Sequence, residues 1–149
     1  MADHPWLRHV ALELDNPAAD NPALKRVERP WGWFETLGAG ETYLVKRLCI
    51  HAGQRISLQR HHHRSEHWVV VSGHGVLECD GIRHSAGPGT GLEVPCGAVH
   101  RATAAPEAHL LIVEVQRGTL LSEDDIERIA DDYQRPSKTL GDKIKVPPL

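Results

Sequence analysis

The chain has 149 residues, of which 40% are hydrophobic and 25% charged, and its formal net charge is −3 at pH 7. This length suits one domain with a sizeable core, and the charge offers no basic face for nucleic acid. No apolar run approaches the ~20 residues that span a bilayer, and the first residues lack the basic and apolar regions of a signal peptide. Three widely spaced cysteines in apolar stretches predict buried free thiols in a reducing cytoplasm.

The first predicted segment is an N-terminal arm over residues 1–28. Residues 15–22 are rich in Asp, Asn and Pro, which is turn chemistry rather than a core element. A few apolar residues precede them, including Trp6, Leu12 and Leu14. The pattern predicts a short arm that packs on the body or on a second subunit.

Residues 29–135 form the predicted body, and most of it reads as short strands. Residues 43–50 alternate apolar and polar side chains as a strand does. Asp80-Gly81 lies between two such runs and predicts a tight hairpin. Further runs of this kind cover 55–62, 66–72, 75–80, 82–84, 91–94, 99–103 and 109–116. Many short strands at regular spacing indicate an all-β sandwich or barrel.

The character of the sequence changes at Ser122. Acidic residues follow it directly, as they do in the first turn of a helix, and apolar residues then recur at helical spacing from Ile126 to Tyr133. This predicts one C-terminal α-helix of roughly three turns, ended by Pro136. Residues 136–149 are predicted to form an extended tail.

A histidine cluster in residues 59–68 is the first candidate for chemistry. On a strand, His61 and His63 would share one face while His62 points away. Two imidazoles followed by the Glu66 carboxylate suit zinc, iron, manganese, nickel or cobalt. A further ligand is needed, and His100 is the best candidate, because a turn at residues 95–97 precedes it at the start of a returning strand.

Together these residues resemble the two signature motifs of the cupin superfamily. His61-x-His63 is followed by Glu66 and then, after six residues, by Gly73; residues 89–100 resemble the second motif. The resemblance implies a double-stranded β-helix, or jelly-roll barrel, with a metal held in its lumen by His61, His63, Glu66 and His100. Only two residues separate His63 from Glu66, where the family has three or four, so Gln59 is an alternative oxygen ligand.

Longer motifs are similar to those of the cupin of type II mannose-6-phosphate isomerases. The resemblance covers residues 29–135 and rests on Arg29-Pro30-Trp31-Gly32, Tyr43-x-Val45-Lys46-Arg47, Gly53 to Gln59, His61-x-His63-Arg64-x-Glu66-His67-Trp68 and Glu114-Val115-Gln116-x-Gly118. In many members this cupin follows a sugar-nucleotide pyrophosphorylase domain, for which this chain has no room. The resemblance therefore implies the cupin activity alone, the interconversion of mannose 6-phosphate and fructose 6-phosphate.

That reaction needs a base, a cation and a phosphate site. Glu114 and Lys46 are the candidates for the base, on strands expected to line the barrel. Arg64 and Arg101 follow proposed ligands and are expected at the mouth of the site, where they and Gln59 would bind substrate.

The predicted cofactor is one divalent metal ion, zinc first, with manganese, cobalt, nickel or iron as alternatives. The expected partners are a small sugar phosphate and a second copy of the chain in a homodimer, with neither nucleic acid nor membrane, in the cytoplasm. Two other functions stay open: a non-catalytic sugar or sugar-phosphate binding cupin, and another metal-cupin enzyme such as a dioxygenase or epimerase.

Overall fold

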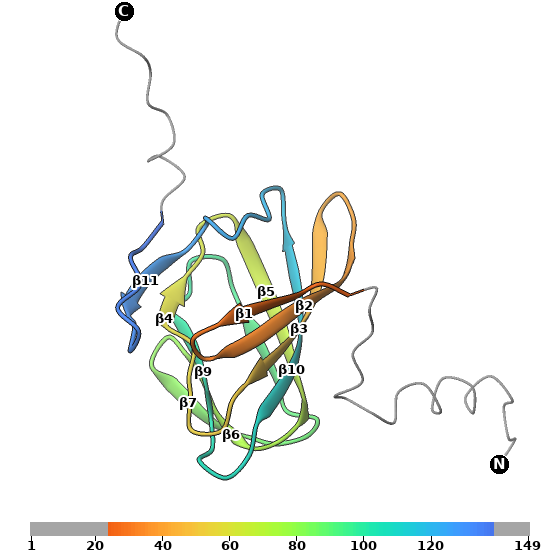
Figure 1. The fold of residues 1–149 in the computed structure, drawn as a ribbon. Helices are drawn as coiled ribbons and strands as arrows, with labels where there is room; N and C mark the ends of the chain where they lie inside the picture. Colours follow the sequence, from red (N-terminus) through yellow and green to blue (C-terminus); the bar gives the residue numbers. More distant parts are fainter. Residues whose placement is uncertain (1–23, 139–149) are drawn as a thin grey trace, which may run out of the picture.

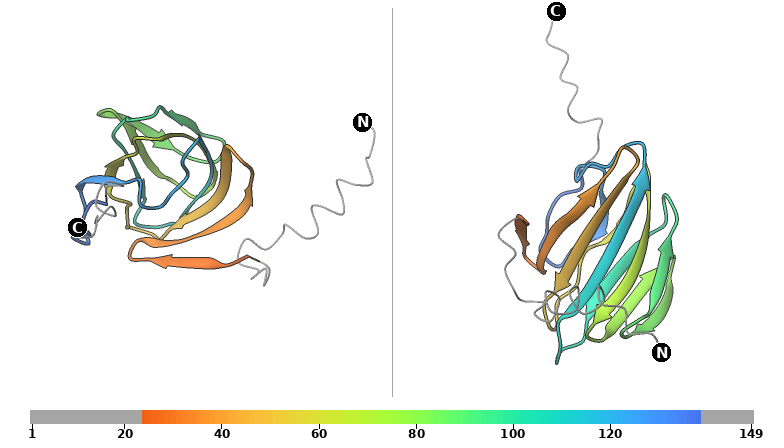
Figure 2. Two further views of the ribbon diagram at one scale, coloured as in Figure 1. Left: turned by 90° about the horizontal axis from the view of Figure 1, so that it is seen from above. Right: turned by 90° about the vertical axis from the view of Figure 1, so that its right-hand side faces the viewer.

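The computed structural model describes residues 24–138, which fold into two facing antiparallel sheets (Figure 1). The six-stranded sheet has the order β1 (Arg26–Arg29), β2 (Gly32–Ala39), β3 (Tyr43–Ile50), β10 (Leu110–Gly118), β5 (Arg64–Ser72) and β8 (Gly91–Val94). The five-stranded sheet has the order β11 (Glu127–Ala130), β4 (Leu58–Arg60), β9 (His100–Ala104), β6 (Gly75–Cys79) and β7 (Ile82–Ala86). The two sheets curve around one interior, so the all-β barrel prediction is confirmed (Figure 2).

The core fills the space between the sheets and follows from strand alternation. Ile50, Leu77 and Ile112 come from β3, β6 and β10, and each is 0% exposed. On β5, Glu66 and Trp68 point inward and are each 1% exposed, whereas the intervening residues face outward. Alternation thus delivers a carboxylate to the interior beside the apolar core.

The predicted hairpin at Asp80-Gly81 is confirmed. Both residues have positive φ, 48° and 80°, and Cys79 pairs with Ile82 across the turn. A two-residue loop of this conformation matches the twist of the flanking strands β6 and β7.

The predicted C-terminal helix is wrong, because the described residues contain no helix in this region. Ser122 does form a capped turn, in which its hydroxyl accepts from the Asp124 amide at 3.1 Å. The chain then continues as β11, which pairs with β4, and Glu127 lies opposite Arg60. The unpaired edge of β4 and the Arg60–Glu127 ion pair, at 2.8 Å, outweigh the local helical pattern.

The predicted segment boundaries are placed as follows. The sheet begins at Arg26, inside the predicted arm, because β1 pairs with β2; the rest of that arm, residues 1–23, lies outside the described residues. At the other end, the Lys138 amide bonds to the Ile126 carbonyl at 2.9 Å, and residues 139–149 also lie outside the described range. The three cysteines are free as expected, but only Cys49 is buried; Cys79 is half-buried and Cys96 is exposed.

Between residues 24 and 138, no helix is long and apolar enough to cross a membrane.

Candidate metal and ligand site

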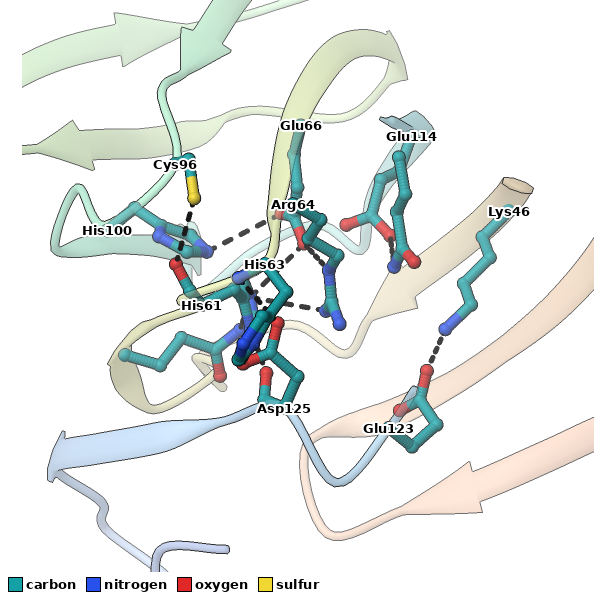
Figure 3. Close-up of polar contacts among 12 residues, drawn as sticks. Lys46, His61, His63, Arg64, Glu66, Cys96, His100, Glu114, Glu123 and Asp125 are labelled. Atoms are coloured by element: carbon teal, nitrogen blue, oxygen red, sulfur yellow. Dashed lines mark hydrogen bonds and ion pairs between the residues drawn. The ribbon is translucent and has the colours of Figure 1, made fainter. Parts of the chain in front are cut away.

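Three buried residues converge inside the barrel (Figure 3). His61 follows β4, Glu66 lies on β5, and His100 begins β9; one ligand atom from each lies within 4.8 Å of the others. His61 Nε2 is 3.1 Å from one Glu66 oxygen, and His100 Nε2 is 3.5 Å from the other. Two imidazoles and a carboxylate from three separate segments therefore aim at one point.

Hydrogen bonds on the far side of each ring orient both imidazoles. His61 Nδ1 donates to the Asp125 carbonyl at 2.6 Å, and His100 Nδ1 donates to the Ala98 carbonyl at 2.9 Å. A carbonyl only accepts, so each Nδ1 carries the proton and each Nε2 faces Glu66. Carbonyl-anchored imidazoles are typical of metal-ligating histidines.

A divalent metal fits this donor set. His100 Nε2 is buried and has no hydrogen-bond partner within the described part of the chain. A buried polar atom of this kind needs a partner, and an imidazole nitrogen beside a carboxylate is a common metal ligand. The unpartnered His100 nitrogen therefore supports a metal ion held by His61, Glu66 and His100.

The charges in the cluster depend on one another. Burial alone would raise the pKa of Glu66, but its pairing with the imidazoles of His100 and His61 holds that pKa well below its ordinary value. Burial lowers the pKa of His100, but Glu66, the Ala98 carbonyl and Glu114 together raise it by more, so this pKa lies above its ordinary value. Protons and a metal ion would therefore compete for the same nitrogen.

His63 lies outside the cluster. Its side chain is 48% exposed, and its Nδ1 is 3.2 Å from an Asp125 carboxylate oxygen. The expectation that His61 and His63 share a strand face is wrong, because β4 ends at Arg60 and residues 62–63 form a bend. Strand alternation does not apply across a bend.

This placement changes which residues correspond to the two histidines of the first cupin motif. Four residues separate His61 from Glu66, so the gap that is short when counted from His63 has ordinary length when counted from His61. Gln59 then occupies the position of the first motif histidine. Its side-chain amide lies 3.4 Å from His61 Nε2, and its oxygen accepts from Ser57 at 2.6 Å.

A polar network continues from the cluster across the lumen. Trp68 Nε1 lies between the two acids, 3.1 Å from Glu66 and 3.0 Å from Glu114. Arg64 Nε donates to Glu66 at 2.9 Å. Burial first, and then the charge of Glu66, raises the pKa of Glu114 from 4.5 to about 7. Glu114 can therefore exchange a proton near neutral pH, as a general acid or base must.

The other predicted site residues divide into two groups. Gln59, Arg64, Lys46 and Glu114 line the same cavity, and Lys46 is paired with Glu123 at its mouth. Arg101 is not at the mouth, contrary to expectation. It follows His100 on β9, so alternation turns it to the opposite face, where it donates to the carbonyls of Ile56 and Ala130, each at 3.1 Å.

Sequence reasoning missed several residues of this cavity. Glu123, Arg128 and Arg135 line its mouth, and all three come from the segment predicted as a helix. Arg29 lines it from the end of β1. No local signal could have found them, because the apolar residues at positions 126, 129 and 130 recur with helical spacing.

Solved structures share this fold. An RmlC-like cupin from Shewanella frigidimarina has a TM-score of 0.61 at 18% identity, covering 70% of this chain and 90% of that one. The capsular polysaccharide assembling protein CapF from Staphylococcus aureus has a TM-score of 0.64 at 16% identity, covering 72% of this chain and 34% of that one. At such identities the likeness concerns the fold alone, and that fold is the cupin barrel.

The sequence places the chain in a particular family of cupins. The family described as mannose-6-phosphate isomerase C-terminal matches residues 18–131, and the chain belongs to it. A mannose-1-phosphate guanylyltransferase from Escherichia coli is 40% identical over 139 residues, 91% of this chain and 29% of that protein. The alginate biosynthesis protein AlgA from Pseudomonas aeruginosa is 38% identical over 133 residues, 89% of this chain and 28% of that protein. The chain thus spans less than a third of these relatives.

The names of these relatives overturn the predicted activity. The sequence motifs predicted an enzyme that interconverts mannose 6-phosphate and fructose 6-phosphate, but the curated relatives are named as guanylyltransferases of mannose 1-phosphate or for alginate biosynthesis. The isomerase prediction is therefore wrong. The motifs report a fold and a site, and a fold of this kind carries many activities.

Proposed function

We propose that this chain is a metal-binding cupin module that binds a phosphorylated mannose in its lumen. The observation that carries the proposal is the convergence of His61, Glu66 and His100, with both Nε2 atoms aimed at one point beside a carboxylate. The family and the names of the relatives suggest a mannose phosphate as the ligand. The polar lining of the lumen around Gln59 and Glu114 suits sugar hydroxyls.

The metal would be held by His61, His100 and Glu66, with Gln59 as a fourth ligand. Rotating the Gln59 amide by half a turn would present its oxygen, rather than its nitrogen, to His61 and the cluster. Zinc is the first candidate for such a mixed set, and manganese, cobalt, nickel and iron accept the same ligands. The bound cation would supply a positive charge that orients and polarises a sugar oxygen.

Metal analysis and calorimetry test the proposal. The purified chain should contain a divalent metal near one equivalent and bind mannose 1-phosphate or mannose 6-phosphate, with the affinity for the sugar phosphate reduced after chelation and dialysis. His61→Ala should remove the metal, whereas His63→Ala should retain it, since His63 is bonded to Asp125 outside the cluster. Loss of metal from both variants, or from neither, would contradict the ligand set.

The homodimer and the cytoplasmic location expected from the sequence stay predictions. Sedimentation equilibrium of the full chain checks the first, and cell fractionation checks the second.

A further inference from the structure

Three arginines from separate segments meet at the mouth of the lumen. Arg29 ends β1, Arg128 lies on β11, and Arg135 follows that strand. All three line the cavity that His61 and Glu66 also line, and they line a second hollow next to it. The two hollows share these three arginines and one acid, Glu123, so the arginines form a basic rim where the hollows adjoin.

Most cations near the lumen are already paired with carboxylates. Arg64 is bonded to Glu66 and Lys46 to Glu123. On the rim, Arg135 holds Asp131 through two hydrogen bonds of 2.8 and 2.9 Å.

Arg29 and Arg128 differ from these. Arg29 donates to the carbonyl of Glu28 at 3.0 Å, and the Arg128 side chain donates to the carbonyl of Pro136. Within residues 24–138, neither has a carboxylate partner among the ion pairs. Arg29 also lies over the Phe34 ring, 5.1 Å from its centroid, so within residues 24–138 these two guanidinium groups contact backbone oxygens and one aromatic ring but form no ion pair with a carboxylate.

Arg128 carries the clearest sign of a missing partner. Its Nε is buried and has no hydrogen-bond partner among the described residues. Burial, and then the positive charges of Arg135 and Arg29, lower the pKa of Arg128 by more than the carboxylates of Asp131 and Glu123 raise it. Like charges gathered around an unpaired buried donor cost free energy, and an anion bound between them would recover it.

We propose that Arg29, Arg128 and Arg135 bind the phosphate of a sugar phosphate whose sugar lies in the lumen. The proposal rests on the proposed function and assigns the orientation of that ligand. Planar guanidinium groups bind the oxygens of a phosphate dianion through paired hydrogen bonds.

The inner lumen disfavours the opposite orientation. Glu66 and Glu114 face it, and the arginine beside them, Arg64, is engaged by Glu66 at 2.9 Å. A phosphate placed there would lie beside the Glu114 carboxylate, whereas sugar hydroxyls can donate to the oxygens of that carboxylate. The phosphate therefore faces outward and the sugar faces the histidine cluster.

Calorimetric titration of the metal-loaded full chain with inorganic phosphate, mannose 6-phosphate and mannose tests the proposal. Arg128→Gln and Arg29→Gln should each weaken binding of both phosphates by about tenfold or more, the effect of losing one charged hydrogen-bond donor. Arg128→Lys should recover only part of the lost phosphate affinity, because lysine keeps the positive charge but lacks the paired donors of the guanidinium group. Binding of mannose and the metal content should not change. Arg83→Gln, at an exposed arginine of β7, is the matched control.

Two results would overturn the proposal. The first is that Arg128→Gln and Arg29→Gln bind inorganic phosphate and mannose 6-phosphate as tightly as the control Arg83→Gln does. The second is that the wild-type chain binds neither of these two ligands. Thermal melts identify any variant that fails to fold. If one of the two glutamine variants does not fold, the variant at the other arginine decides whether the proposal holds. Failure of the metal site alone would leave arginine-dependent binding of inorganic phosphate intact. That outcome would refute the proposed function but support the phosphate site formed by Arg29, Arg128 and Arg135.

Discussion

Asp125 is the residue whose replacement tests most directly how the site is built. Its carboxylate accepts the backbone amides of His62 and His63, both at 3.0 Å, and its own carbonyl accepts His61 Nδ1. The side chain is 3% exposed. One residue thus fixes the bend that places His61 and also orients the His61 ring.

Asp125→Ala removes the charged acceptor of two amides. A hydrogen bond to a charged group contributes about 1.5–3 kcal/mol when its partner is left unpaired. The side chains of His62 and His63 are exposed, so water can replace part of the loss. We therefore expect a loss of about 2–4 kcal/mol in the free energy of unfolding, which corresponds to roughly 5–15 °C in Tm for a domain of this size.

The same change should weaken the metal site. Losing an outer contact that orients a ligand typically lowers metal affinity by about 10- to 100-fold. Asp125→Asn keeps one acceptor oxygen and should have an intermediate effect. Urea unfolding reports the stability, and competition with a chelator reports the affinity.

Asp124→Ala is the matched control, since Asp124 is the neighbouring acid and its carboxylate is 3.4 Å from Lys138, away from His61. Stability and metal affinity that match between the two alanine variants would refute the role assigned to Asp125.

Three further predictions concern the barrel and its interior. Ile112→Ala, at a side chain that is 0% exposed, should cost about 2–5 kcal/mol in urea unfolding, whereas Val71→Ala, at 49% exposure, should cost about 0.5 kcal/mol or less. Gly73→Ala should cost at least about 2 kcal/mol, because φ is +84° and a Cβ would lie 1.8 Å from a backbone oxygen; Gly81→Ala, with φ of +80° and open space, should cost about 1 kcal/mol. The pKa of Glu114 is raised from 4.5 to about 7, so the folded state keeps a proton that the unfolded state has lost. This stabilisation is present below pH 4.5 and is lost as pH rises to about 7. Glu114→Gln should therefore stabilise the protein at pH 8 relative to pH 5, by up to about 3 kcal/mol, and equal shifts at both pH values would contradict the assignment.

The strands and turns were predictable because their signals are local. Alternation in residues 43–50 and the Asp80-Gly81 turn each depend on a few neighbouring residues, and both occur as expected. His100 was placed correctly at the start of its strand for the same reason. Local patterns are most reliable where burial on one face enforces them.

The departures arise from contacts between distant parts of the chain. Residues 127–130 form a strand because the edge of β4 accepts them, which no pattern within residues 122–135 indicates. The bend that separates His61 from His63 depends on the Asp125 carboxylate, which lies 63 residues after His62 and 62 residues after His63 in the chain. The basic rim follows from that same segment, so one wrong element concealed Arg128 and Arg135 together.

Gln59 offers the sharpest test of the revised motif. If it occupies the position of a metal-ligating histidine, a neutral amide oxygen replaces an imidazole nitrogen in the set of His61, His100 and Glu66. Amide oxygens suit manganese better than imidazole does, whereas imidazole favours zinc and nickel. Gln59→His should therefore raise affinity for nickel relative to manganese by about tenfold or more, as measured by competition with a chelator. Its neighbour Leu58→His, on the other face of β4, should leave that ratio unchanged. An unaltered ratio in Gln59→His would mean that residue 59 does not reach the metal, and that three protein ligands hold it.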